Sequence, residues 1–200
     1  MNIEPSQSHL KKQLRKEIRQ RRSAIAPAQR EQWNASINRN LEAYVRLHRP
    51  RRVAAFLAFD GEADILPALA ALSQQQVKLA LPVVTEAPGK SVITMREWHP
   101  ADALAPNQFG IAEPANSPEV RVTDIDLVLV PLVGWDRQGN RLGMGASYYD
   151  RLFQPFVERE RPVRMGVAYE VQRVETIPSE PWDIRLHGIL TEKGWNSGPF

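Results

Sequence analysis

Four residues that together could hold a phosphate group and its metal ion lie within ten positions of one another: Arg141, Gly143, Gly145 and Asp150. Glycine lets an anion approach backbone N–H groups, and a guanidinium offers a forked contact to phosphate oxygens. A carboxylate such as that of Asp150 can hold Mg²⁺ bridging those oxygens. The combination predicts phosphoryl transfer, which depends on positioning and charge and needs no side-chain nucleophile.

Each of these residues also has a purely structural interpretation. Gly143 and Gly145 are typical of a turn with positive φ. Asp150 would be a favourable acid in the first turn of a helix, worth about 0.3–1 kcal/mol. Because arginine, glycines and aspartate occur together, we prefer the functional interpretation.

The flanking residues predict the elements that position this loop. Residues 127–133 form an apolar run, LVLVPLV, typical of a strand buried on both faces. Residues 148–153 predict a short helix, with Tyr149, Leu152 and Phe153 at helical spacing. A strand, a glycine-rich loop and a helix in this order often bind phosphate, because N–H groups at a helix start carry partial positive charge.

The segment does not match three common glycine-rich motifs. A P-loop needs lysine and a hydroxyl residue where this chain has Asn140 and Arg141. A dinucleotide-binding motif would need its third glycine at Tyr148, and a nucleophile elbow around Ser147 would need glycine at Tyr149. These three types of site are therefore not predicted.

A basic amphipathic helix is predicted over residues 10–26. Its apolar stripe and its basic face lie side by side. Residues 11–22 hold seven Lys or Arg and one acid, Glu17. The face is consistent with solvent exposure, with RNA binding, or with phosphate binding on the folded side. The stripe is Leu10, Leu14, Ile18 and Ile25, and the face is Lys11, Arg15, Arg19 and Arg22.

The remaining chain alternates strands and helices, which predicts a three-layer α/β/α sandwich with a mostly parallel central sheet. No Pro/Gly/Ser-rich linker divides it, so we expect one domain. The predicted helices are 27–49 and 65–75, the further strands are 53–59, 77–84, 91–98, 163–168 and 188–191, and residues 100–122 form an irregular loop.

Two acids follow the first strand of the predicted sheet. Glu62 and Asp64 stand where α/β folds place ligand contacts, at the carboxyl end of a parallel strand. Asp64 could instead cap the next helix. Both interpretations stay open from the residues alone.

Composition excludes several classes of protein. The chain of 200 residues has no cysteine, so it has no disulfide and no thiolate metal site. Its four histidines lack the spacing of metal ligands, so we do not expect a zinc enzyme. The N-terminus lacks a signal-peptide core, and no apolar run approaches the roughly 20 residues of a membrane span. We expect a cytoplasmic protein.

The segment RLGMGASYYD, residues 141–150, resembles the RLGxGxGYYD signature of the 5-formyltetrahydrofolate cyclo-ligase family, and Trp135-Asp136 precedes it. The resemblance extends from KKQLR at residues 11–15 to ILTE at 189–192. It implies one domain over residues 1–200 with a CoA-transferase-like fold, and a monomer. It also implies a Mg²⁺- and ATP-dependent ligase that converts 5-formyltetrahydrofolate to 5,10-methenyltetrahydrofolate with release of ADP and phosphate.

The resemblance assigns roles to individual residues, and it makes nucleic acid and membrane partners unexpected. Asp150 would bind Mg²⁺, and Arg141 and Tyr148 would be catalytic. The substrate 5-formyltetrahydrofolate would contact Phe59, Glu62, Asp64, Trp135, Met144 and Tyr148. ATP would contact Lys11, Lys12, Arg15, Arg141, Leu142, Gly143, Met144, Gly145, Ala146, Ser147, Tyr148 and Tyr149.

This chain departs from the family pattern at several positions. Ser147 stands where the family has a further glycine, and together with Ala146 it makes the loop less open. Ile65 replaces a threonine. Some members carry an acid near His187 as a second metal contact, which we expect to be absent here. A diverged paralogue that binds folate or nucleotide without catalysis, and a basic RNA-binding accessory protein, are the alternatives.

Overall fold

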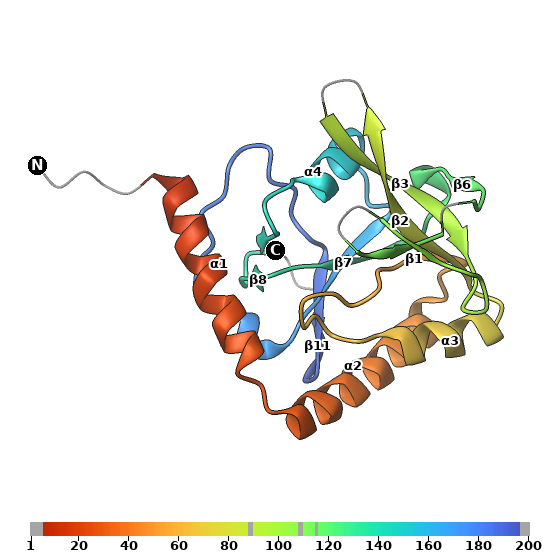
Figure 1. The fold of residues 1–200 in the computed structure, drawn as a ribbon, viewed down its shortest axis with the longest axis horizontal. Coiled ribbons are helices and arrows are strands. Elements are labelled where there is room, and N and C mark those ends of the chain that lie inside the picture. The colour runs from red at the N-terminus through yellow and green to blue at the C-terminus, as the bar shows by residue number, and fades with distance from the viewer. Residues whose placement is uncertain (1–5, 88–89, 108–109, 115, 197–200) are drawn as a thin grey trace, which may run out of the picture.

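The computed structural model describes residues 6–87, 90–107, 110–114 and 116–196 and has a large sheet at its centre (Figure 1). In these residues the sheet has eight strands, of which those from β11 to β2 are parallel and the rest antiparallel to their neighbours. The spatial order is β12 (Gly194–Asn196), β11 (Gly188–Thr191), β10 (Val163–Val167), β7 (Leu127–Pro131), β1 (Arg52–Ala54), β2 (Lys78–Ala87), β3 (Lys90–Trp98) and β6 (Glu119–Val120).

The three central strands are in register at one edge. Val53 of β1 lies opposite Leu127 of β7, which lies opposite Val163 of β10. The first four residues of β7 are buried, as expected for a strand covered on both faces. Because these strands are parallel, the segments that follow them begin at the same edge of the sheet.

Helices cover both faces of the sheet. α2 (Pro27–His48) and α3 (Leu66–Gln74) pack on one face through Ile37 and Leu69, whereas α4 (Tyr148–Phe153) packs on the other through Phe153. Fully burying such a side chain contributes about 1.5–3 kcal/mol. The predicted three-layer sandwich with a mostly parallel sheet is confirmed.

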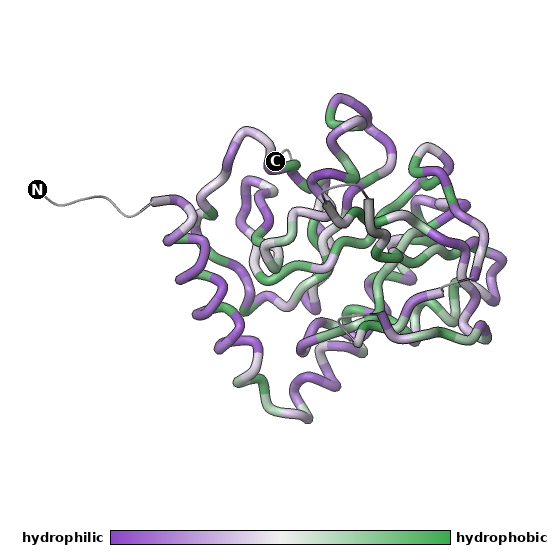
Figure 2. Tube along the Cα trace, turned by 45° about the horizontal axis from the view of Figure 1, so that its top comes forward, coloured by the Kyte–Doolittle hydropathy of each residue, from purple (hydrophilic) through white to green (hydrophobic). Residues whose placement is uncertain are grey.

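α1 (Gln7–Ser23) packs on the segments that follow β7 and β10, not on a face of the sheet (Figure 1). These segments are the hairpin of β8 (Gly134–Trp135) and β9 (Arg141–Leu142), and the turn η3 (Glu170–Gln172). Ile18 is fully buried against Leu142, and a Cβ at Gly134 would lie only 2.5 Å from its Cδ1. The rest of α1 is mostly hydrophilic (Figure 2).

Several predicted boundaries differ from the observed ones. α1 begins and ends three residues before the predicted 10–26, because Ser6 Oγ accepts a hydrogen bond from His9 N at its start. The first strand ends at Ala54 instead of Phe59, since the chain then leaves the sheet towards the candidate site. The predicted irregular loop 100–122 contains β4 (Ala105–Pro106), β5 (Ala112–Glu113) and β6.

Other predicted elements are confirmed. The helix at 148–153 is α4, and Pro27 begins α2 as expected for a proline at the first helical position. In the part of the chain that the structure describes, no helix is both long enough and apolar enough to cross a bilayer. The turn η1 (Val122–Asp124) leads into β7, and η2 (Gln154–Phe156) continues α4.

Candidate active site

The glycine bend at residues 143–145 is held by the basic face of α1. Arg15 Nε donates a hydrogen bond to the carbonyl oxygen of Gly143 over 2.8 Å. Gly145 has φ 112°, which disfavours any side chain, and a Cβ there would lie 3.8 Å from the guanidinium carbon of Arg15. Gly143 does not have positive φ, and a Cβ there would meet nothing within 4 Å. Only Gly145 therefore needs to be glycine for the bend itself.

Lys11 lies one turn before Arg15 and forms an ion pair with Asp183. Its Nζ is 2.6 Å from Asp183 Oδ2, which also accepts a hydrogen bond from Glu180 N over 2.8 Å. The sequence patterns assign no site role to Asp183, which the structure brings to Lys11. Lys12 is exposed on the neighbouring position of the helix.

Arg141 and Asp150 are bound to each other. Arg141 Nη2 is 2.5 Å from Asp150 Oδ1, and Ile184 N donates to the same oxygen over 3.0 Å. Arg141 Nη1 also donates to the Ile184 carbonyl oxygen. The Arg141 side chain is only 6% exposed. Its guanidinium, which the sequence predicts to bind phosphate, is bound to Asp150 and Ile184. It links β9, α4 and the segment that carries Asp183.

The carboxylate of Asp150 suits Mg²⁺ only as one ligand among several. Its Oδ1 is occupied by protein donors. The described residues hold no group of three or more His, Cys, Asp or Glu side chains placed to bind a metal. Mg²⁺ is commonly held by one or two carboxylates plus phosphate oxygens and water, and the single carboxylate of Asp150 fits that kind of site.

The rest of the bend is divided between core and surface. Leu142 is buried against α1, whereas Met144, Ala146 and Ser147 are exposed. Ser147 has φ 50°, a left-handed conformation that glycine adopts without strain. This is the position at which the resemblance expects glycine.

The two tyrosines of α4 differ in their surroundings. Tyr148 is half-buried, with the Arg151 guanidinium carbon 5.3 Å from its ring centroid. The Tyr149 ring is partly exposed, but its hydroxyl is buried without a hydrogen-bond partner. Burial first, and the charge of Glu62 second, raise the pKa of Tyr149. Glu62, from the segment after β1, therefore lies close enough to α4 for its charge to act on the Tyr149 hydroxyl.

The segment after β1 presents two of the predicted folate contacts. Phe59 is 45% exposed, and its N–H group donates to Glu62 Oε2 over 3.1 Å. Burial raises the pKa of Glu62 to about 7, although the Phe59 N–H group and the charge of Arg22 act against this rise. Asp64 Oδ1 accepts a hydrogen bond from Leu66 N over 3.0 Å, so Asp64 serves the start of α3.

Trp135 lies in the apolar core. It is 6% exposed, and its Nε1 is 3.5 Å from the Tyr169 carbonyl oxygen. The fully buried Asp136 beside it accepts hydrogen bonds from Asn140 and from Ile177 N. These contacts give Trp135 and Asp136 a structural role, because they hold the β8–β9 hairpin that precedes the bend.

His187 is remote from this site. It precedes β11, and its Nδ1 accepts a hydrogen bond from Arg164 N near the start of β10, over 3.2 Å. The amino ends of these strands form the opposite edge of the sheet. The acid that this part of the chain brings to the site is Asp183, four residues earlier.

Two cavities lined by the described residues lie outside this candidate site, and neither is a better candidate for it. One of about 650 Å³ lies at the amino ends of β1 and β2, lined by Arg51, Arg52 and Lys78 among others. Another of about 640 Å³ lies beside α2 and reaches Asp64. We place the site by its side-chain chemistry, because the first cavity is at the wrong end of the parallel strands.

The structure leaves few α1 cations free for RNA. Lys11, Arg19 and Arg22 pair with acids of the folded protein, and Arg15 binds the bend. Arg21 pairs with Glu17 within the helix. The basic face of Lys11, Arg15, Arg19 and Arg22 is therefore engaged mainly in contacts with the folded protein.

Comparisons with known proteins find relatives that match most of this chain. A model of the 5-formyltetrahydrofolate cyclo-ligase family matches residues 7–192. The 5-formyltetrahydrofolate cyclo-ligase of Haemophilus influenzae is 31% identical over 182 residues, covering 90% of this chain and 96% of the relative. That of Escherichia coli strain K12 is 34% identical over 184 residues, covering 89% and 98%.

Solved structures show the same fold. The NMR structure of Aquifex aeolicus 5,10-methenyltetrahydrofolate synthetase has a TM-score of 0.79 at 31% identity and covers 94% of this chain and 92% of that one. A synthetase from Mycoplasma pneumoniae has a TM-score of 0.73 at 23% identity, covers 91% and 98%, and supports the fold alone. The chain belongs to the 5-formyltetrahydrofolate cyclo-ligase family.

Proposed function

We propose that this protein converts 5-formyltetrahydrofolate to 5,10-methenyltetrahydrofolate, using ATP and Mg²⁺ and releasing ADP and phosphate. The observation that carries the proposal is the contact of Arg15 with Gly143, which joins the basic helix to the glycine bend. The same helix also binds the segment that presents Phe59 and Glu62. Helix α1 thereby contacts both the proposed nucleotide-binding side and the proposed folate-binding side of the site.

The nucleotide side consists of α1 and the bend. Lys11 and Arg15 supply cations, and the exposed bend from Met144 to Ser147 offers backbone N–H groups. Together they suit the oxygens of a triphosphate. Phosphate oxygens would compete with Asp183 for Lys11, whose ion pair is partly exposed.

Asp150 would hold Mg²⁺ together with phosphate oxygens and water. The ion would neutralise charge on the phosphoryl group being transferred. Arg141 and Ile184 N hold the Asp150 carboxylate in a fixed orientation. The side-chain geometry of this chain thus supports a single-carboxylate site.

The reaction needs no nucleophile from the protein. The formyl oxygen attacks the terminal phosphorus of ATP, an O–P bond forms, and ADP leaves. The neighbouring folate nitrogen then attacks the formyl carbon, the C–O bond breaks, phosphate departs, and the nitrogen loses its proton. Holding that nitrogen against the carbon is an effect of proximity that a fitted pocket can supply.

The folate side is formed by Phe59, Glu62, Met144 and Tyr148. Phe59 and Met144 are exposed apolar side chains, which suit contact with a reduced pterin ring. The Glu62 carboxylate suits the ring's N–H donors. Tyr148 on α4 would close the pocket beside Met144.

A coupled assay tests the proposal. The protein is incubated with ATP, Mg²⁺ and 5-formyltetrahydrofolate, and both ADP release and the absorbance of the methenyl product are followed. The two should rise in equal amounts and depend on each substrate. Absence of both signals over a range of pH and Mg²⁺ concentrations would contradict the proposal.

One observation favours a second function, a binding protein without catalysis. Ser147 adopts left-handed backbone where the family signature has glycine, so the bend carries a local strain. Tight binding of ATP and folate without ADP release would identify this alternative.

A further inference from the structure

The turn that carries Phe59 and Glu62 has an unusual backbone. Glu62 N donates to the Phe59 carbonyl oxygen over 3.0 Å, and the two residues between them, Asp60 and Gly61, have φ of 52° and 79°. Glycine adopts positive φ freely, but aspartate does so at a cost. Such a conformation persists when surrounding contacts hold it.

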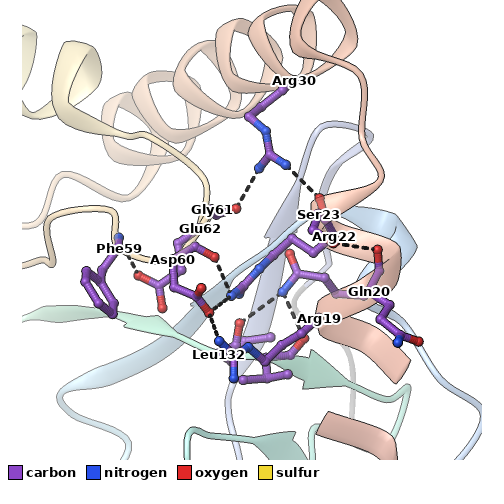
Figure 3. Close-up of polar contacts among 12 residues, drawn as sticks. Arg19, Gln20, Arg22, Ser23, Arg30, Phe59, Asp60, Gly61, Glu62 and Leu132 are labelled. Atoms are coloured by element: carbon purple, nitrogen blue, oxygen red, sulfur yellow. Dashed lines mark hydrogen bonds and ion pairs between the residues drawn. The ribbon is translucent and has the colours of Figure 1, made fainter. Parts of the chain in front are cut away.

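Three arginines supply those contacts (Figure 3). Arg22 Nη2 donates to the carbonyl oxygen of Asp60 over 2.7 Å and to its Oδ2 over 2.9 Å. Arg30 Nη1 donates to the Gly61 carbonyl oxygen over 2.7 Å, and its Nη2 donates to the Arg22 carbonyl oxygen over 2.6 Å. Arg19 pairs with Asp60 Oδ2 at 3.0 Å. Of these three arginines, only Arg22 donates hydrogen bonds to both the backbone and the carboxylate of Asp60.

Arg22 differs from Arg19 in its burial. Its side chain is 2% exposed, against 49% for Arg19, and its Nη1 has no hydrogen-bond partner. Burial lowers the pKa of Arg22, while the charges of Glu62 and Asp60 oppose this. A buried guanidinium with an unsatisfied donor is a poor device for stability alone, because an apolar side chain is often at least as stable there. The burial of this charge against the turn favours a role in positioning.

Arg22 also connects the turn to the nucleotide side. It lies seven residues after Arg15, so both project from nearby sides of α1. Ile18, fully buried between them, fixes the helix on the hairpin of β8 and β9. One rigid helix therefore holds the glycine bend at Gly143 and the turn at Asp60.

We propose that Arg22 is a positioning residue, which holds the turn from Phe59 to Glu62 in the geometry needed to bind the reduced folate. The inference rests on the proposed function. Arg22 itself need not touch the substrate; it acts through Asp60 on the two neighbouring side chains that do.

The test compares Arg22→Met with Arg22→Lys and with Arg21→Met. Arg21 is the adjacent exposed arginine, paired with Glu17 one turn earlier on the helix. Equilibrium dialysis measures binding of 5-formyltetrahydrofolate, and steady-state assays give separate KM values for folate and ATP. Thermal unfolding checks that each variant is folded.

Arg22→Met should weaken folate binding about tenfold or more while changing the KM for ATP by about twofold or less. Arg22→Lys should recover part of the folate affinity because it keeps the charge, and Arg21→Met should match the wild type. Asp60→Asn should weaken folate binding moderately, because asparagine tolerates left-handed backbone but loses the charge that pairs with Arg22. If neither Arg22 variant folds, Asp60→Asn tests the positioning role in their place, and wild-type folate affinity in it would overturn the inference.

Wild-type folate affinity in folded Arg22→Met would overturn the inference, as would an equal loss for ATP and folate. Failure of the wild type to bind or turn over folate would instead contradict the proposed function, and the two outcomes are therefore distinct.

Discussion

The guanidinium of Arg141 is ion-paired with the carboxylate of Asp150, Nη2 to Oδ1 at 2.5 Å. The sequence suggested separate roles for them, one on phosphate and one on Mg²⁺. Through this contact each side chain fixes the position of the other, and both bind Ile184, which follows Asp183. Phosphate and metal would enter a pair that is already assembled.

Arg141→Ala should lower kcat/KM for ATP about tenfold or more, since it removes a forked cation and loosens Asp150. It should also lower the free energy of unfolding by about 1.5–3 kcal/mol, because hydrogen bonds to charged groups are lost. Coupled turnover and urea unfolding measure these effects. Arg137→Ala, an exposed arginine in the same hairpin, is the control. Wild-type turnover in Arg141→Ala would contradict the assigned role.

Asp150→Asn should raise the Mg²⁺ concentration needed for half-maximal ADP release by about tenfold. Asparagine can still accept the hydrogen bonds of Arg141 and Ile184 N, so the fold should be retained. Exposed Glu158 provides the matched variant Glu158→Gln, which should not alter the Mg²⁺ response. An unchanged Mg²⁺ titration for Asp150→Asn would place the metal elsewhere.

Ser147→Gly should raise the free energy of unfolding by up to about 1 kcal/mol, because it relieves a left-handed serine with φ 50°. It should also improve kcat/KM for ATP by opening the bend. Ala146→Gly, one residue earlier and without positive φ, should instead destabilise the protein by about 0.4–1 kcal/mol. Urea unfolding of both variants checks the contrast, and equal effects would show that backbone strain at Ser147 is unimportant.

Much of the fold could be predicted because its signals are local. The apolar run of β7 and the periodicity of α4 are readable from a few neighbours, and both elements form where expected. The hairpin of β8 and β9 was missed, because strands of two residues have no detectable alternation. Its geometry comes from the buried Asp136, which accepts hydrogen bonds from Asn140 inside the hairpin and from the distant Ile177 N.

The site was harder to predict than the fold. Asp183 reaches Lys11 across 172 residues from an irregular, proline-containing segment that has no periodic signal. Arg22 was grouped with the basic face of α1, although it continues the spacing of Leu14 and Ile18 at four-residue steps. That spacing places it on the buried stripe, and it was the available clue that its charge lies inside the protein.

Folate binding should depend on pH through Glu62, whose pKa is raised to about 7. Burial is the largest cause of this rise in the Glu62 pKa; the charge of Asp60 adds to it, and the Phe59 N–H group and the charge of Arg22 oppose it. Because the carboxylate form accepts hydrogen bonds from the pterin, kcat/KM for folate should rise as pH increases through about 7. Glu62→Gln should lower it and flatten the profile, whereas Glu31→Gln on exposed α2 surface should not. A profile of Glu62→Gln that keeps this rise would assign it to another group.

His187 should make stability depend on pH at the other edge of the sheet. Burial, and then the charge of Arg164, lower the pKa of His187 from 6.5 to about 4. Between these values the unfolded chain binds a proton that the folded protein does not, so the free energy of unfolding falls as pH decreases from 6.5 towards 4. Above pH 6.5 this stabilisation is fully present.

His187→Gln keeps a side-chain acceptor for Arg164 N but cannot titrate, so its stability should decrease less over the same range. Urea unfolding of both proteins at several pH values between 7 and 4 measures the difference, and the carboxylates that titrate in this range are common to both. Since His187 lies away from the bend and the Asp60 turn, kcat/KM at pH 7 should stay within about twofold of the wild type. Parallel stability curves would mean that His187 titrates normally in the folded protein.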